Sequence, residues 1–176
     1  MAAGNTYEAI ATLTASGGAA TQLVMSSIPA TYTDLVLIVN GGNSLSGATW
    51  AIQLNGDTGS NYSWTIMEGS GTTATSSRSS TSGLTIASMY FSYETGVGAS
   101  GVTAIANFQN YANTTTYKTV LMRQNTVTAP NYPGVSAGVG LWRNTAAITS
   151  ITIIIPGGAT NIASGTTFSL YGIKAA

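Results

Sequence analysis

Residues 49–68 read TWAIQLNGDTGSNYSWTIME, and this stretch decides the fold class. Apolar and polar side chains alternate in Thr49–Leu54, which is the period of a half-buried β-strand. The pair Asn55-Gly56 follows, and it supplies the positive φ angles that a type I′ turn requires. Asn61–Glu68 then reads as the returning strand. The stretch therefore predicts two strands paired as a hairpin across the Asn55-Gly56 turn.

The rest of the chain continues this pattern of short strands separated by turn residues. Asp34–Asn40 (DLVLIVN) is apolar on both faces, which predicts a strand in the middle of a sheet. Helical periodicity is almost absent. Ten to eleven strands are expected, drawn from Thr6–Thr14, Gln22–Ile28, Asp34–Asn40, Thr49–Leu54, Asn61–Glu68, Leu84–Tyr93, Val102–Gln109, Tyr117–Gln124, Val135–Trp142, Ile148–Ile155 and Thr166–Ile173. Their spacing predicts a single all-β domain, an antiparallel β-sandwich with little or no helix.

Two segments are too polar to bury surface by themselves. Gly69–Gly83 (GSGTTATSSRSSTSG) has no apolar residue larger than alanine, and Arg78 is its one charge. It is expected to be a low-complexity loop, either a floppy hairpin extension or an arm that a partner orders. Residues 1–5 are a possible N-terminal arm, which can order on a partner or fray.

The composition argues against most classes of enzyme. The 176 residues contain no cysteine and no histidine, which excludes disulfides, zinc–thiolate sites, cysteine nucleophiles and the Ser-His-Asp triad. Only 6% of the residues are charged, against about 25% in an ordinary soluble domain. The five acids and five bases cancel. We therefore expect no enzymatic activity, no cofactor, and neither nucleic acid nor membrane as a partner.

Serine and threonine make up 48 of the 176 residues. A surface of such side chains is uncharged and hydrogen-bonding, and few rotamers are frozen when it meets a partner. That surface suits a protein held in a large assembly or exported to a harsh exterior, and a merely β-rich composition is the alternative. Residues 1–5 lack a basic start, so no signal peptide is expected. No stretch approaches the ~20 apolar residues that span a membrane.

Few residues qualify as a site. Asn55, Gly56, Asp57 and Asn61 place oxygen-bearing side chains on a tight turn, faintly like a calcium loop. Calcium needs six to eight oxygens and usually more than one carboxylate, so we favour a turn in which Asn and Asp bond their own backbone. No metal is expected there.

The three tryptophans and five carboxylates are the other candidates. Trp50 and Trp64 flank the Asn55-Gly56 turn and could lie on one face as a platform for sugar, although core packing is the favoured reading for them and for Trp142. The carboxylates form no close pair in the sequence. A glycosidase dyad could therefore arise only through folding.

Several short motifs resemble a family of tailed-bacteriophage virion proteins. They are NGDTGSNYSW (Asn55–Trp64), SSIP (26–29), YTDL (32–35), FSLYGIK (Phe168–Lys174), the opening Tyr7–Ile10 and the stretch Trp142–Ile148. The resemblance runs from about Tyr7 to Ile173. It implies a jelly-roll β-sandwich on the exterior of a virion, either a capsid decoration (cement) protein or a tail-fibre or tail-tip module. It brings no catalytic or ligand residue with it.

Two functions of different classes follow from this resemblance. We expect a capsid decoration protein, a homotrimer on the capsid exterior that bridges subunits of the major capsid protein. Its compact length without a fibrous repeat favours this function, and Asn5, Tyr7 and Arg78 are the candidate contacts with the capsid. The alternative is a tail-fibre or tail-tip module that recognises a host by binding a cell-surface glycan. A glycan depolymerase is a weaker third possibility.

Overall fold

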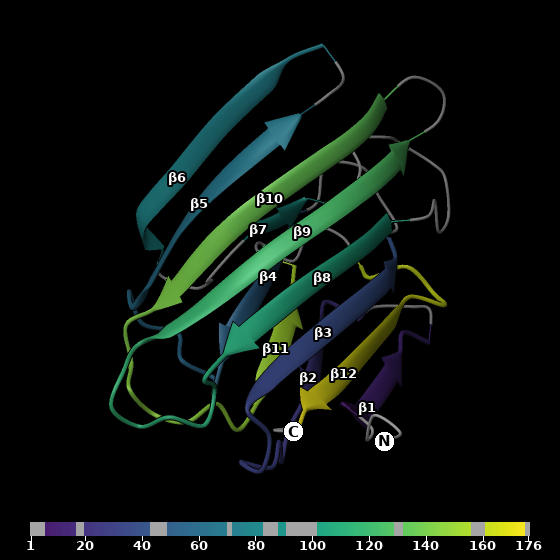
Figure 1. Ribbon diagram of the computed structural model, residues 1–176. Coiled ribbons are helices and arrows are strands. Elements are labelled where there is room, and N and C mark those ends of the chain that lie inside the picture. The colour runs from purple at the N-terminus through teal and green to yellow at the C-terminus, as the bar shows by residue number, and fades with distance from the viewer. Residues whose placement is uncertain are drawn as a thin grey trace, which may run out of the picture.

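The computed structural model describes residues 6–16, 20–42, 49–69, 72–82, 88–90, 102–128, 132–155 and 161–174. Within these ranges the chain forms twelve β-strands and no helix (Figure 1). The strands are β1 (Tyr7–Thr14), β2 (Gln22–Met25), β3 (Asp34–Gly41), β4 (Thr49–Leu54), β5 (Tyr62–Gly69), β6 (Ala74–Ser82), β7 (Ser88–Tyr90), β8 (Val102–Gln109), β9 (Lys118–Thr128), β10 (Tyr132–Trp142), β11 (Ile151–Ile154) and β12 (Thr167–Ile173). The described part of the chain thus has no helix that could cross a membrane.

The strands form two antiparallel sheets that lie face to face. The larger has eight strands in the order β1-β12-β3-β8-β9-β10-β5-β6, and the smaller has four in the order β2-β11-β4-β7. In Figure 1 the larger sheet is in front and the smaller one lies behind it, while no strand of the smaller sheet lies behind β6. The expected all-β, antiparallel β-sandwich is confirmed.

The strand pairs are nested along the chain. β1 pairs with β12, β2 with β11, β3 with β8, and β4 with β7. These eight strands therefore pair as one long hairpin that has been rolled into two sheets. The hairpins β5–β6 and β9–β10 are inserted into this arrangement, and both extend the larger sheet at the same end.

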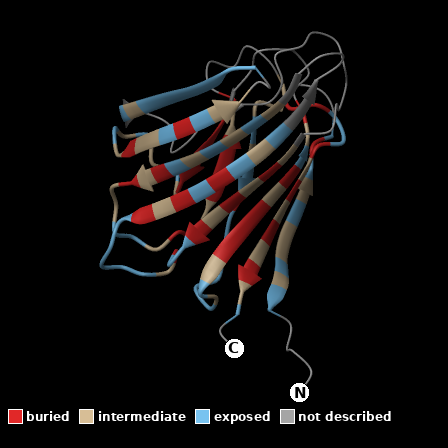
Figure 2. Cartoon of the chain, turned by 45° about the horizontal axis from the view of Figure 1, so that its top comes forward, coloured by how far each residue is buried: buried red, intermediate tan, exposed pale blue. Residues whose placement is uncertain are grey.

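The core lies between the sheets and follows from alternation along the strands. In β12 the side chains of Phe168 and Leu170 are fully buried while their neighbours are only half-buried, which appears as banding in Figure 2. Trp50 of β4 meets Phe168 across the two sheets, with ring centroids 5.0 Å apart. As expected, β3 is central in its sheet, between β12 and β8, and even its outward-facing Val36 is buried.

Most expected strands are found with shifted ends. The ranges Thr49–Leu54 and Val102–Gln109 agree with β4 and β8, whereas β9 and β10 are longer than expected and β2 and β11 are shorter. Of the expected strand Leu84–Tyr93, the described residues are 88–90, which form β7. The possible arm at residues 1–5 lies outside the described residues.

The predicted hairpin between β4 and β5 is wrong. β4 pairs with β11 and β7 in the smaller sheet, and β5 pairs with β10 and β6 in the larger one. The turn itself is confirmed, because φ is 51° at Asn55 and 65° at Gly56, and the Asp57 amide donates to the Leu54 carbonyl at 2.9 Å. The turn therefore leads the chain from the smaller sheet to the larger one, and beside β11 the apolar residues of β4 are fully buried, which the hydrophobic effect favours.

The expectation of a loop at residues 69–83 is also wrong in part. Its residues 74–82 form β6, the edge strand beside β5. From Ala74 to Ser80 all side chains of β6 are exposed except the half-buried Ser79, so both faces of the strand are open, and Figure 2 shows this part of the strand mostly in blue. The strand is therefore held mainly by backbone hydrogen bonds to β5, which a hydrophobic pattern cannot predict.

Replacing Gly56 by valine tests the turn. A Cβ at Gly56 would meet nothing within 4 Å, so the cost comes only from the positive φ. We expect Gly56→Val to lower the free energy of unfolding by about 1–3 kcal/mol, because a β-branched residue is strained there. Gly56→Asn is the control, since asparagine tolerates this conformation. Equal stability of the two variants in urea denaturation would contradict the assignment.

Candidate functional site

The predicted loop at Asn55–Asn61 is brought together around the Asp57 carboxylate. Oδ1 of Asp57 accepts a hydrogen bond from the Gly59 amide at 2.8 Å. Oδ2 accepts one from Asn61 Nδ2 at 2.8 Å and one from Trp142 Nε1 at 2.7 Å. Trp142 lies at the end of β10, 85 residues further along the chain, so this carboxylate ties the loop to the larger sheet.

Asn55 ties the same loop to the segment that leads into β11. Its Nδ2 donates to the Ala147 carbonyl at 2.7 Å, and its Oδ1 accepts from the amides of Thr149 at 2.8 Å and Ser150 at 3.1 Å. The side chain thus replaces the backbone partners that this irregular segment lacks.

These contacts explain the ionisation of Asp57. Burial by itself would raise the pKa of this carboxyl, but the hydrogen bonds from Trp142, Asn61 and Gly59 outweigh burial and hold the pKa below its ordinary value. The neighbouring Tyr62 hydroxyl donates to the Asp57 carbonyl at 2.9 Å, and burial raises the pKa of Tyr62 to about 12. Both oxygens of the Asp57 carboxylate accept hydrogen bonds from donors within the protein, which favours a structural turn over a calcium loop.

The tryptophans do not form one platform. Trp50 is buried in the core, and Trp142 is buried with its ring stacked on Tyr62 at a centroid distance of 6.4 Å. Trp64 is half-buried on β5. Because β4 and β5 belong to different sheets, Trp50 and Trp64 do not share a face as the hairpin prediction required.

The candidate contact residues are not brought together. Tyr7 is 60% exposed on β1, one edge of the larger sheet, and Arg78 is exposed on β6, the opposite edge. Asn5 lies outside the described residues. Tyr7 and Arg78 therefore cannot belong to one small site.

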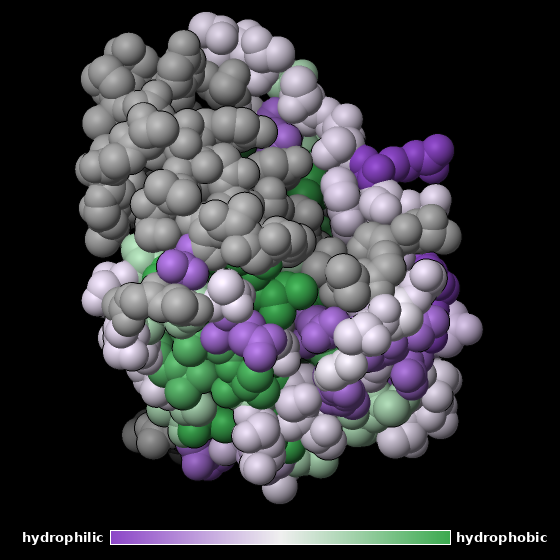
Figure 3. Space-filling view, turned by 180° about the vertical axis from the view of Figure 1, so that it is seen from behind, coloured by the Kyte–Doolittle hydropathy of each residue, from purple (hydrophilic) through white to green (hydrophobic). Residues whose placement is uncertain are grey.

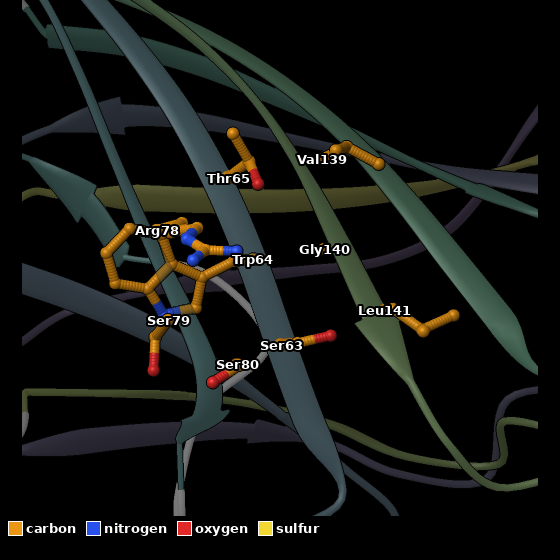
Figure 4. Close-up of a pocket in the computed structure, with 9 residues that line it drawn as sticks. All are labelled: Ser63, Trp64, Thr65, Arg78, Ser79, Ser80, Val139, Gly140 and Leu141. Carbon is orange, nitrogen blue, oxygen red and sulfur yellow. The ribbon is translucent and has the colours of Figure 1, made fainter.

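A shallow groove of about 260 Å³ lies on β5, β6 and β10 (Figure 4). Its lining combines serine and threonine with apolar side chains and one arginine. The nine lining residues are Ser63, Trp64, Thr65, Arg78, Ser79, Ser80, Val139, Gly140 and Leu141. Two residues that the sequence analysis singled out line it, the candidate contact Arg78 and the candidate sugar-binding residue Trp64.

Sequence reasoning missed an exposed apolar surface on β9, β10, β5 and β6, four neighbouring strands that we call the wing. Val135 and Val139 alternate with glycine and serine along β10, and alternation predicts the strand correctly. The valines face outward, however, because a Cβ at Gly138 would lie 3.1 Å from Ile66 Cγ1 on the inner side. The sequence contains a signal for this orientation, since glycines and one serine occupy the positions that alternate with the valines.

Sequence reasoning also missed Lys118, whose side chain is buried. Its Nζ donates to the Thr116 carbonyl at 2.7 Å and to the Thr145 carbonyl at 3.0 Å. Burial lowers the pKa of this ammonium group. The lysine is a structural connection between two loops at the end of the sandwich.

Substituting Lys118 by methionine should change the pH dependence of stability. The unfolded chain binds its lysine protons more tightly than the folded protein binds the one at Lys118. The free energy of unfolding of wild type therefore rises as pH increases from the lowered pKa of Lys118 in the folded protein towards about 10.4, the pKa of an unfolded lysine. Lys118→Met should abolish this contribution and alter stability at pH 7 by less than about 1.5 kcal/mol, because a flexible apolar side chain of similar length remains. Urea denaturation from pH 7 to 10 measures both effects, and parallel curves for the two proteins would refute the prediction.

Among the described residues no group of three or more Asp, Glu, His or Cys side chains could hold a metal ion. In the view from behind in Figure 3, many of the coloured residues are pale, which reflects weakly polar side chains, purple areas lie among them, and a green apolar area lies in the lower half of the view. In the comparisons with known proteins, no family description, no curated protein and no solved structure matches this chain.

Proposed function

We propose that this protein is a structural protein of a bacteriophage virion, a decoration (cement) protein on the capsid exterior. It stabilises the shell by bridging subunits of the major capsid protein, and it acts as a homotrimer. A clamp of this kind gains strength from contact area and from many copies rather than from one strong site.

The observation that carries this proposal is the nested pairing of β1, β2, β3 and β4 with β12, β11, β8 and β7. A rolled hairpin of eight strands in two sheets supports the expected jelly roll, a fold used by viral capsid domains and also by lectins and cupins. Because one fold hosts many functions, the sequence motifs from Tyr7 to Ile173 supply the second support, by their resemblance to phage virion proteins.

The surface chemistry agrees with a clamp. Only 6% of the residues are charged, so close approach to a neighbour requires little desolvation of charge. Exposed serine and threonine hydroxyls can satisfy their hydrogen bonds across a wet interface. We therefore expect binding to the shell to persist in high salt.

The alternative is a tail-fibre or tail-tip module that binds a glycan, and one observation favours it. The groove on β5, β6 and β10 includes an arginine, three serines and a half-buried tryptophan. Burial of Trp50 and Trp142 argues against a wider aromatic platform.

The decisive experiment adds the purified protein to capsid shells that lack it. We expect saturable binding and a higher temperature of shell disruption. Quantitative mass spectrometry of virions should find hundreds of copies. A handful of copies, with no binding to shells, would reject decoration in favour of the tail module. Analytical ultracentrifugation tests the trimer.

A further inference from the structure

The outer face of the wing gathers most of the exposed apolar side chains that the structure describes. Met67 and Val135 are 63% and 62% exposed, and Leu121 and Val139 are each 42% exposed. These are four of the seven large apolar side chains that are exposed among the described residues. All four lie on the face turned away from the smaller sheet, because the residues that alternate with them, such as Ile66 and Met122, are buried.

Strand register makes these residues neighbours. Val139 lies opposite Leu121 on one side and Thr65 on the other, and Thr65 lies opposite Arg78. The next outward-facing row runs from Met67 through Ala137 to Arg123. The two rows form one continuous patch of apolar and small side chains.

Two arginines stand at opposite corners of this patch. Arg78 and Arg123 are three strands and two residues apart, which places their Cα atoms about 16 Å from each other at ordinary strand spacings. Both are exposed, and neither forms an ion pair with any described residue.

The other basic side chains of the chain are already engaged. Lys118 is buried and bonded to two carbonyls, Arg143 donates to the carbonyls of Ser60 and Tyr62, and Lys174 pairs with Glu8. The positive charges that are not already engaged, Arg78 and Arg123, are therefore both on the wing. Glu68, the acid of β5, alternates with Met67 and so lies on the opposite face.

This charge pattern selects the kind of partner. Two copies of the chain joined through this face would place two pairs of arginines in one interface, and no carboxylate of the described residues lies on this face to offset their charge, which is unfavourable. A different surface that carries carboxylates beside apolar groups is complementary to it. The wing face measures roughly 19 Å by 26 Å, on the order of 500 Å², from strand spacing and rise. That area is a large part of the ~800 Å² that each side of a standard interface buries.

We propose that the outer face of the wing is the surface that docks on the capsid shell, and that the facing shell surface presents carboxylates to Arg78 and Arg123. This inference rests on the proposed decoration function. It places the contact on a β-sheet face that includes Arg78, whereas the sequence also named Asn5 and Tyr7 as candidate contacts.

The test measures binding to undecorated shells with matched pairs of variants. Arg78→Gln with Arg123→Gln changes the net charge by minus two on the wing. Gln22→Glu with Val24→Glu makes the same change on exposed positions of β2, in the other sheet. At low salt we expect the wing variant to bind at least about tenfold more weakly and the β2 variant to stay within about twofold of wild type.

A third variant separates apolar contact from charge. Met67→Ser with Val139→Ser should weaken binding at all salt concentrations. In about 1 M salt, where the Debye length is roughly 3 Å, wild type should still bind the shell through its uncharged contacts, with the affinity that the double arginine variant has at low salt. Melting temperatures close to that of wild type must accompany each result, since all substituted positions are exposed.

The outcomes are distinguishable. If the arginine variant and the apolar variant both bind shells as tightly as wild type does, the wing is not the docking surface. The decoration function would still stand. Failure of wild type to bind shells rejects the decoration function, and the inference with it. If the purified chain self-associates and the Met67→Ser, Val139→Ser variant does not, this face binds a second copy of the chain instead.

Discussion

Gly172→Ala is expected to lower the free energy of unfolding by about 3 kcal/mol. Gly172 lies in β12 between β1 and β3, and an added Cβ would sit 2.2 Å from Tyr32 Cγ and 2.5 Å or less from both Cδ atoms. These atoms lie near the root of the ring, so the whole Tyr32 side chain would have to leave its place against the core. Overpacking of this kind costs about 1–3 kcal/mol and occasionally more.

A double-mutant cycle identifies the cause. In a Tyr32→Ala background the space above Gly172 is empty, so the added methyl group should cost less than about 0.5 kcal/mol, as for independent surface changes. Gly69→Ala is the matched strand glycine, since its Cβ would make an ordinary 3.5 Å contact with Val135. Thermal and urea denaturation measure the four proteins of the cycle and the Gly69→Ala control. The explanation fails if Gly172→Ala costs as much without the tyrosine ring as with it.

Strands with a strong hydrophobic signal could be predicted from the sequence. Asp34–Asn40 is apolar on both faces and proved to be central, and β12 alternates without interruption between buried and half-buried residues. In these segments burial decides the conformation, so local sequence is sufficient. The absence of helical periodicity set the fold class for the same reason.

Pairing between distant strands could not be predicted. Asn55-Gly56 correctly specified a turn with two positive φ angles, but a turn fixes only the local chain direction. β4 pairs with β11, about a hundred residues later in the chain, and its apolar side chains are buried there. Nothing in residues 49–68 identifies that partner.

Three features of the surface and interior escaped the sequence for separate reasons. β6 is ordered by a backbone ladder to β5, which leaves no trace in hydropathy. The apolar residues of β10 face outward because Gly138 lies against Ile66 and leaves no room for a side chain. Lys118 can be buried because its ammonium group donates to two carbonyls, and one of them, that of Thr145, lies 27 residues further along the chain.

The second large effect is expected at Asp57. Asp57→Ala should lower the free energy of unfolding by about 2–4 kcal/mol, because the buried Trp142 Nε1 would lose its acceptor and the Asn61 and Gly59 donors would lose theirs. A buried donor left without a partner costs about 1–3 kcal/mol, and hydrogen bonds to a charged group are stronger than average.

The Asp57–Trp142 pair can be isolated with a matched substitution. Trp142→Phe removes the donor and keeps most of the ring, so Asp57→Ala should cost less in that background than in wild type. The difference between the two costs is the coupling energy, which we expect to be about 1–2 kcal/mol for a buried charge-assisted hydrogen bond. Additive effects of the two substitutions in urea denaturation would show that the loop and β10 are not joined through this bond.

The pH dependence of Asp57→Asn provides an independent check on the charge. The pKa of Asp57 is lower in the folded protein than its ordinary value of about 3.9, so the unfolded chain binds this proton more readily. The contribution of the carboxylate to stability is therefore present in full above about pH 5 and is lost as pH falls through the folded pKa. Asparagine also places an amide NH2 group, itself a donor, against the donors around residue 57, so the variant should be less stable than wild type at pH 7. The difference in free energy of unfolding between the two proteins should become smaller below about pH 4. A gap that stays constant from pH 7 to pH 3 would mean that Asp57 acts through shape alone and that its ionised form is not what holds the loop to Trp142.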